Sequence, residues 1–190
     1  MGALDDGERV VATDAVAWRA WLELNHATST GAWLVRPRPR SGLVLIEYED
    51  AILQALCFGW IDGPVRTFDE TTSGLWFAPR RPSSGWAATN KARIALLEQN
   101  GMLAPAGIRA IEVAKANGSW TVLDNAEALR EPDDLAAALD AVPAARAGWD
   151  GFPPSARKLG ITSVDTARRP ETRAARIAKI VADAAEGKRP

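Results

Sequence analysis

The chain has 190 residues, of which 47% are hydrophobic and 25% are charged, and its 23 basic and 24 acidic residues leave a net charge of −1. This composition is typical of a globular protein with its own core, and it excludes attraction of the whole molecule to nucleic acid or anionic membranes, while local basic patches stay open. The single cysteine, Cys57, and the single histidine, His26, exclude an intramolecular disulfide and a zinc site built from the usual nitrogen and sulfur ligands.

The N-terminal stretch Met1–Glu8 contains acidic residues and no apolar run, so we expect no secretory signal. No stretch approaches the ~20 apolar residues that a membrane span needs, and we expect a cytoplasmic protein. We predict one domain over residues 1–190, in which residues 1–12 form a flexible tail, 13–100 a strand-containing half and 101–190 a helical half.

In the first half, apolar side chains at helical spacing predict a helix that Thr13 or Asp14 caps and that ends near His26. A second helix is expected over residues 48–58. Short apolar runs bounded by turn residues predict strands over 32–35, 61–68 and 75–78, with another short extended segment at 43–46. The alternation of Pro37 and Pro39 with arginines at 36, 38 and 40 predicts a stiff basic loop instead of further strand.

From residue 83 onward the pattern is helical. Ser83 or Ser84 is expected to cap a helix over 86–99, and Pro105 starts one that runs to Asn117. After a loop over 118–132, four helices are expected to start near Asp133 or Asp134, Pro143, Pro153 and Pro170. The predicted fold class is therefore α+β: a small antiparallel sheet in the N-terminal half covered by helices, and an all-helical C-terminal half.

Eight tryptophans and one tyrosine are an unusual aromatic content, and we expect most tryptophans in the core and a few in a functional cleft. The junction around Trp60 and Asp62 is one candidate, since a carboxylate at a strand start is either a turn cap or a partner for a cation. Arg80, which follows Pro79, is a candidate for anion binding. Asn90 and Arg93 lie among apolar neighbours on one helical face, so they contact either a neighbouring aspartate or a ligand.

Three further groups have a structural and a functional interpretation. His26 at a helix end either caps carbonyls or acts as a general base. Cys57 near a helix C-terminus favours the neutral thiol and a core position over a nucleophile. Arg169, Arg173 and Arg176 share a helical face that is either solvated or contacts phosphates, without the interleaved aromatic residues typical of nucleic-acid binding.

Several segments together resemble the YdeI/OmpD-associated family, described as bacteriocin-protection proteins. The segments are Trp21-Leu22-Glu23-Leu24-Asn25-His26, Gly31-Ala32-Trp33-Leu34, Ala55-Leu56-Cys57-Phe58-Gly59-Trp60-Ile61-Asp62-Gly63, Pro79-Arg80, Ser84-Gly85-Trp86, Asn90, Arg93 and Arg169-Pro170-Glu171-Thr172-Arg173. The resemblance extends roughly from Trp18 to Lys188. It implies resistance to antimicrobial peptides or membrane stress in bacteria and brings no established catalytic residues.

One departure from that family concerns Gly160 and Ser163, which stand where a tyrosine and a tryptophan are expected. Replacing two large aromatic side chains with small ones opens a void unless another tryptophan or a ligand fills it.

The leading hypothesis is a bacteriocin-protection type protein that binds a small molecule or peptide in a tryptophan-lined cleft. One alternative is a cofactor-independent enzyme with a remodelled pocket near Gly160–Ser163, in which Asp62, His26 and Arg80 are the catalytic candidates. The other is weak nucleic-acid binding through the C-terminal arginine-rich helix. No cofactor, metal or membrane span is expected, and the sequence assigns no oligomeric state. The expected ligand-binding residues are Trp60, Trp76, Arg80, Trp86, Asn90 and Arg93.

Overall fold

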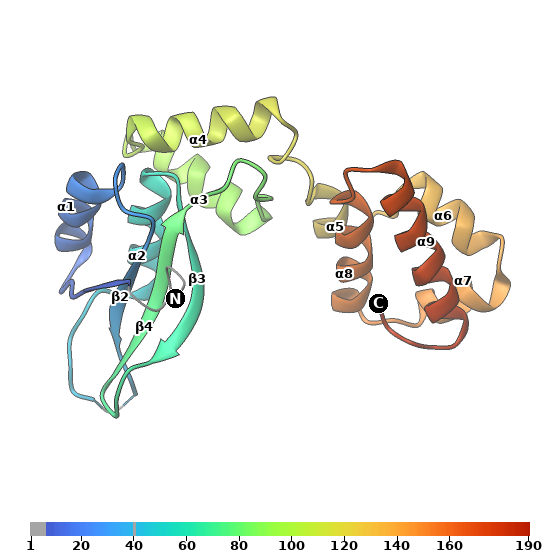
Figure 1. The fold of residues 1–190 in the computed structure, drawn as a ribbon, viewed down its shortest axis with the longest axis horizontal. Helices are drawn as coiled ribbons and strands as arrows, with labels where there is room; N and C mark the ends of the chain where they lie inside the picture. Colours follow the sequence, from blue (N-terminus) through green and yellow to red (C-terminus); the bar gives the residue numbers. More distant parts are fainter. Residues whose placement is uncertain (1–6, 40) are drawn as a thin grey trace. The chain divides into compact units, whose positions relative to one another are not determined.

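The computed structural model describes residues 7–39 and 41–190, which divide into two compact units. The first unit extends to Ser84 and resumes with Lys91–Asn117, and the second comprises Gly85–Asn90 and Gly118–Pro190. The prediction of a single domain stays a prediction, and each unit is described by itself (Figure 1). The fold class is α+β as predicted, with all strands before residue 80 and only helices after it.

The sheet of the first unit is mixed and has the strand order β1-β2-β4-β3. Its strands are β1 (Glu8–Val10), β2 (Ala32–Pro37), β3 (Trp60–Thr67) and β4 (Thr72–Pro79). β2 pairs antiparallel with β4, which pairs antiparallel with β3, while β1 pairs in parallel with β2. The expected antiparallel sheet therefore has one parallel edge strand. The expected flexible tail is also wrong over Glu8–Val10, because this segment gains its hydrogen-bond partners from a strand distant in sequence.

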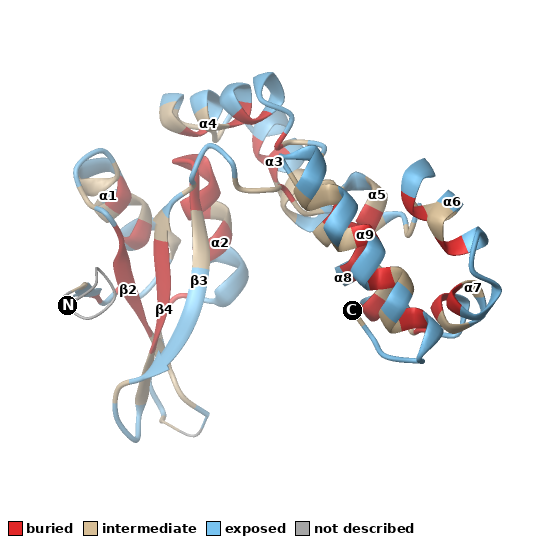
Figure 2. Ribbon diagram, turned by 45° about the vertical axis from the view of Figure 1, so that its right-hand side comes forward, coloured by how far each residue is buried: buried red, intermediate tan, exposed pale blue. Residues whose placement is uncertain are grey.

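Helices α1 (Ala15–Asn25) and α2 (Tyr48–Cys57) cover one face of this sheet. Asp14 caps α1 as predicted, since its carboxylate accepts a hydrogen bond from the backbone N–H of Ala17 at 2.8 Å. Trp18 is fully buried, stacks on Trp21 at 5.1 Å and donates its indole N–H to the carbonyl of Ala51 in α2. Figure 2 shows the consequence: β2 and β4 are largely buried, whereas most of β3 is exposed.

The remaining helices begin close to the predicted proline and aspartate positions. α3 starts at Ala88, two residues after the predicted position, and the expected loop over 118–132 contains one short helix, α5. The elements are α3 (Ala88–Gln99), α4 (Pro105–Ala116), α5 (Asp124–Glu127), α6 (Asp133–Asp140), α7 (Pro143–Asp150), α8 (Pro154–Asp165) and α9 (Pro170–Ala185).

Helices α5 to α9 of the second unit pack around Trp149, which is fully buried on α7. Its indole N–H donates to Glu131 at 2.7 Å, and Arg146 holds the same carboxylate with a hydrogen bond of 2.9 Å. Two glycines let backbones and rings come close. A Cβ atom on Gly148 would lie 2.0 Å from the backbone oxygen of Ala184 in α9, and one on Gly160 would lie 2.8 Å from the Trp149 ring.

We predict that Gly148→Ala lowers the free energy of unfolding by about 2–3 kcal/mol, because α7 and α9 must separate to accommodate the methyl group. Gly151→Ala at the end of the same helix is the matched control: its Cβ atom would meet nothing closer than 3.5 Å. The control is expected to change the free energy by less than ~0.5 kcal/mol. Urea unfolding followed by circular dichroism measures both variants, and equal effects would contradict the proposed close contact.

Candidate functional site

The tryptophans expected in a cleft are buried in the cores of the two units. Trp60 exposes 1% of its surface and meets the edge of Trp21 at 5.8 Å, and Trp76 exposes 7% and packs against Trp33 at 5.2 Å. In the second unit Trp86 exposes 1% and packs against Trp120. Binding of a ligand by these rings stays a prediction, and it requires the rings to leave these packed positions.

Asp62 forms a polar cluster with two side chains from neighbouring elements of the first unit. The register of β3 places Asp62 beside Phe77 of β4, on the face that α2 covers. Tyr48, in the first turn of α2, donates its hydroxyl hydrogen to Asp62 at 3.2 Å. Arg93 of α3 binds Glu49, the next residue of α2, through two hydrogen bonds of 2.7 and 2.6 Å. Arg93 therefore pairs with Glu49, a partner that the sequence did not suggest, and it also lies within electrostatic reach of Asp62.

The charges of this cluster influence one another. Burial raises the pKa of Tyr48, and the charge and hydrogen bond of Asp62 raise it further. The hydrogen bonds to Glu49 raise the pKa of Arg93. Burial lowers the pKa of Arg80 to about 10, partly offset by Asp62, so Arg80 stays cationic at neutral pH. Asp62 and Arg80, two predicted site residues, thus lie within electrostatic reach of each other.

Sequence reasoning missed Tyr48 and Arg36 as members of this region. The guanidinium of Arg36, on β2, lies 5.2 Å from the ring centre of Tyr48, a cation–π contact. Tyr48 is the only tyrosine of the chain, and it follows Glu47 at the start of a predicted helix. A single polar aromatic residue at a helix start is the sequence signal that could have identified Tyr48 as a candidate site residue.

His26 and Cys57 have mainly structural surroundings. His26 ends α1: its backbone N–H and its ring Nδ1 both lie 2.8 Å from the carbonyl oxygen of Leu22. The ring also borders a cavity of about 460 Å³ with Arg19, Glu23 and Arg109. Cys57 is fully buried, and burial raises the pKa of its thiol, which agrees with a core position.

Asn90 lies half-buried in the first turn of α3 and stays a predicted ligand-binding residue. Gly160 is covered by the ring of Trp149, so a tryptophan occupies the space where the sequence suggested a void. The arginine-rich helix is α9, and its cations bind within the unit. Arg173 holds Asp134, Arg176 donates to the carbonyl of Ser163, and an enzyme pocket or nucleic-acid site there stays a prediction.

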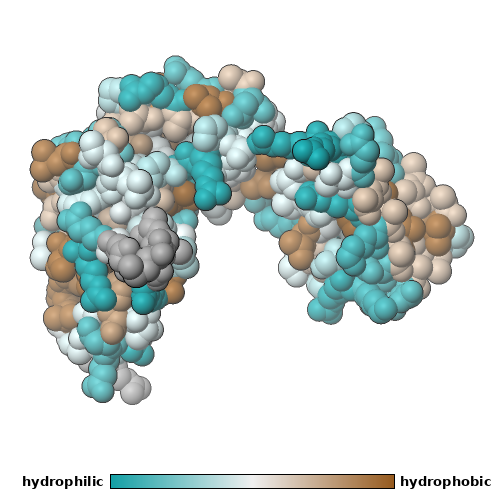
Figure 3. Space-filling model, in the orientation of Figure 1, coloured by the Kyte–Doolittle hydropathy of each residue, from teal (hydrophilic) through white to brown (hydrophobic). Residues whose placement is uncertain are grey.

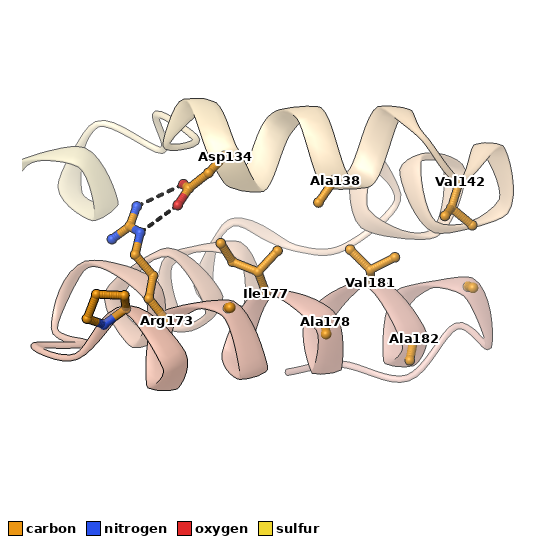
Figure 4. Close-up of a pocket in the computed structure, with 11 residues that line it drawn as sticks. Asp134, Ala138, Val142, Arg173, Ile177, Ala178, Val181 and Ala182 are labelled. Atoms are coloured by element: carbon orange, nitrogen blue, oxygen red, sulfur yellow. Dashed lines mark hydrogen bonds and ion pairs between the residues drawn. The ribbon is translucent and has the colours of Figure 1, made fainter.

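An open groove of about 760 Å³ lies between α6 and α9 of the second unit. In Figure 4, Ile177 and Val181 of α9 point toward α6, and Ala138 of α6 points back toward them. Figure 3 shows pale-brown surface over this part of the unit. Small apolar side chains make up most of the lining: Ala138, Val142, Pro170, Ala174, Ile177, Ala178, Val181, Ala182 and Ala185.

One ion pair closes an end of the groove. The guanidinium of Arg173 binds both carboxylate oxygens of Asp134 at 2.6 and 2.9 Å, and it also donates to the carbonyl of Val164 at 3.0 Å. These hydrogen bonds lower the pKa of Asp134 and raise that of Arg173. The remaining length of the groove is apolar, so it suits an apolar ligand surface better than an isolated charge.

Comparison with known families assigns the two parts of the chain differently. Residues 10–110 match the model of a domain of unknown function (DUF8412). Residues 128–187 match the model described as bacteriocin-protection, YdeI or OmpD-associated. The chain belongs to the DUF8412 family and carries a YdeI/OmpD-associated domain. No curated protein and no solved structure matches the chain significantly.

The YdeI/OmpD-associated match covers helices α6 to α9 and therefore every residue that lines the groove. The resemblance seen in the sequence extended from Trp18, whereas the match begins at residue 128. The DUF8412 match contains the polar cluster around Tyr48 and Asp62. In the described ranges no helix has both the length and the hydropathy for crossing a membrane. Among the same residues, no group of three His, Cys, Asp or Glu side chains is placed to hold a metal ion.

We predict that Asp62→Asn lowers the pKa of Tyr48, because the substitution removes a negative charge that disfavours the tyrosinate. The pKa should stay above the ordinary tyrosine value, since burial is the largest cause of the shift. Absorbance titration of tyrosinate reports this one residue, as the chain has a single tyrosine. Asp69→Asn, in the exposed turn between β3 and β4, is the control, and an equal decrease there would contradict the contact.

Proposed function

We propose that the protein protects against bacteriocin-type peptides by binding an amphipathic, basic peptide helix in the groove between α6 and α9. The observation that carries this proposal is the apolar groove of about 760 Å³ within the segment that matches the bacteriocin-protection family. Binding of an amphipathic helix in an apolar groove is a common mode of peptide recognition. The proposal keeps the predicted peptide ligand and moves it away from the buried tryptophans.

The shape of the groove supports a helical ligand. Ala174, Ala178 and Ala182 are exposed on α9 and follow one another at intervals of four residues, so they form one continuous strip. Their methyl groups allow the backbone of a second helix to approach closely. Val181 of α9 and Val142, the residue before α7, add larger apolar contacts at the same groove. An apolar helix face would thus be removed from water along its length.

Charge supports a basic ligand. Helix α6 forms one side of the groove and has three aspartates, Asp133, Asp134 and Asp140, and no basic side chain. Asp134 and Asp140 are engaged by arginines of the same unit, whereas Asp133 is exposed at the start of the helix. A lysine beside the apolar face of a bound helix would therefore meet Asp133, and the attraction should weaken as salt is added.

We predict that Ala178→Arg weakens binding of a labelled basic amphipathic peptide at least about tenfold, because the new side chain fills the groove and repels cations. Ala175→Arg is the matched control, since Ala175 is exposed on the same helix but does not line the groove. Fluorescence anisotropy measures both affinities, with a scrambled peptide of the same composition as the ligand control. Equal losses in the two variants, or equal binding of the scrambled peptide, would contradict groove binding.

The same pair of variants tests protection in cells. A bacteriocin-sensitive bacterium that expresses the protein should survive a higher peptide concentration, and Ala178→Arg should remove that advantage while Ala175→Arg keeps it. If the Ala178→Arg variant still protects the cells at equal protein levels, protection does not depend on binding in the groove.

A second candidate function is binding of a small anionic molecule at Asp62 and Arg80, with Asp62 and Tyr48 available for proton transfer. The hydrogen bond between Tyr48 and Asp62, beside a half-buried arginine, favours it. A carboxylate and a phenol that share a proton, near a fixed cation, can orient and protonate a bound substrate.

For this second function, we expect Arg80→Met to abolish the rise in melting temperature that an anionic metabolite produces, because the cation that orients the ligand is lost. Arg81→Met is the control, since Arg81 is the exposed neighbour. Differential scanning fluorimetry against a panel of carboxylates and phosphates measures both. If no compound raises the melting temperature of the unchanged protein, this function is excluded for the panel.

A further inference from the structure

We propose that the first unit binds anionic phospholipid surfaces through a basic groove at the end of β2, with neighbouring apolar side chains inserting into the membrane. This site is separate from the groove between α6 and α9 and does not depend on it. It lies where the sequence alternates proline and arginine after the second strand, a motif that neither proposed function uses.

The groove has a volume of about 600 Å³ and is positively charged. It lies between the loop that follows β2 and the strands β3 and β4. Arg36 and Arg38 supply two cations, and none of the described residues that line it is acidic. Three hydroxyl side chains complete the polar part: Ser41, Thr67 and Ser73. Guanidinium groups together with hydroxyl donors form the usual environment for a phosphate group.

Contacts within the fold already hold the two arginine side chains, so they lose little conformational entropy when a ligand binds. Arg38 donates from its guanidinium to the carbonyl of Asp69 at 2.7 Å, and its backbone N–H bonds to Thr71. Arg36 lies over the ring of Tyr48, and its buried Nε–H has no hydrogen-bond acceptor among the described residues. A buried donor without an acceptor is uncommon, and a phosphate oxygen at this guanidinium would compensate for it.

Apolar side chains beside the groove distinguish a membrane from a soluble phosphate. Leu43 and Val65 line the groove and expose 47% and 64% of their surface, and Val44, next to Leu43, exposes 85%. Figure 3 shows hydrophobic surface along the loop between β2 and α2. Exposed aliphatic residues beside arginines match a bilayer interface, where phosphates lie above acyl chains. A soluble phosphate compound would leave these side chains in water.

Sedimentation with vesicles tests the proposal on the full chain. Vesicles that contain phosphatidylglycerol should bind the protein at low salt, and vesicles of phosphatidylcholine alone should not. Arg38→Gln should weaken binding about fivefold, since one cation near the anionic surface is removed. Leu43→Ser with Val44→Ser should weaken it roughly tenfold through lost insertion while the charge is unchanged.

Matched controls change exposed side chains elsewhere in the first unit. Arg109→Gln on α4 removes one positive charge, and Val16→Ser on α1 removes an aliphatic side chain that is 76% exposed. Both should bind vesicles as the unchanged protein does. Circular dichroism of every variant checks that the fold persists, so loss of binding in Arg38→Gln is assigned to the groove.

Three outcomes would overturn the proposal. Equal binding to phosphatidylcholine vesicles would remove the role of charge. Binding of glycerol phosphate in calorimetry, with vesicle binding unaffected by the Leu43→Ser and Val44→Ser changes, would assign the groove to a soluble phosphate compound. Binding of single-stranded nucleic acid that Arg38→Gln weakens, without any vesicle binding, would assign it to nucleic acid instead.

Discussion

The second unit depends on one buried tryptophan whose polar atom must be satisfied. Trp149 is removed from water and donates its indole N–H to Glu131, and Arg146 compensates the charge of that carboxylate. Burying the indole N–H without an acceptor would cost about 1–3 kcal/mol and offset part of what burial of the ring contributes. The ring also needs space, which Gly160 provides on α8, while Gly148 beside it lets α7 contact α9 through backbone atoms. The positions of three helices thus follow from one side chain.

The groove between α6 and α9 is a consequence of the same packing. Once α9 is held against α7 through Gly148, the side chains between α6 and α9 decide whether the remaining space is filled. Leu135 and Leu139 of α6 are fully buried in the core, but Ala138 faces the groove with only a methyl group. Alanines on α9 face it in turn, so no large side chain closes the gap. Because the side chains here are small, the unit buries less apolar area than larger side chains would bury. An apolar surface therefore stays exposed, and another molecule can cover it.

The sequence predicted the helices better than the site. Prolines and aspartates at helix starts are local determinants, and they placed the beginnings of α4, α6, α7, α8 and α9 closely. β1 was missed because three residues carry no periodic pattern and the strand is stabilised by a partner elsewhere in the chain. Most tryptophans were expected in the core, but which of them are exposed in a cleft depends on tertiary contacts that no spacing reveals. Asp62 and Arg80 were both predicted site residues and lie within electrostatic reach of each other, and Tyr48 and Arg36 join them through the packing of α2 on β2 and β3.

The arginines of the first unit illustrate why equal residue types carry different functions. Arg93 is engaged by Glu49 in a bidentate pair, so its charge is compensated within the fold. Arg80 is half-buried near Asp62, where a ligand must match a cation and an anion together. Arg36 and Arg38 border a groove in which none of the described lining residues has a carboxylate, so their positive potential extends into the solvent. Salt screens outward-facing charges most strongly and half-buried ones least. Added salt should therefore weaken anion binding at the basic groove at lower concentrations than it weakens anion binding at the cluster around Asp62, although Arg36 borders both sites.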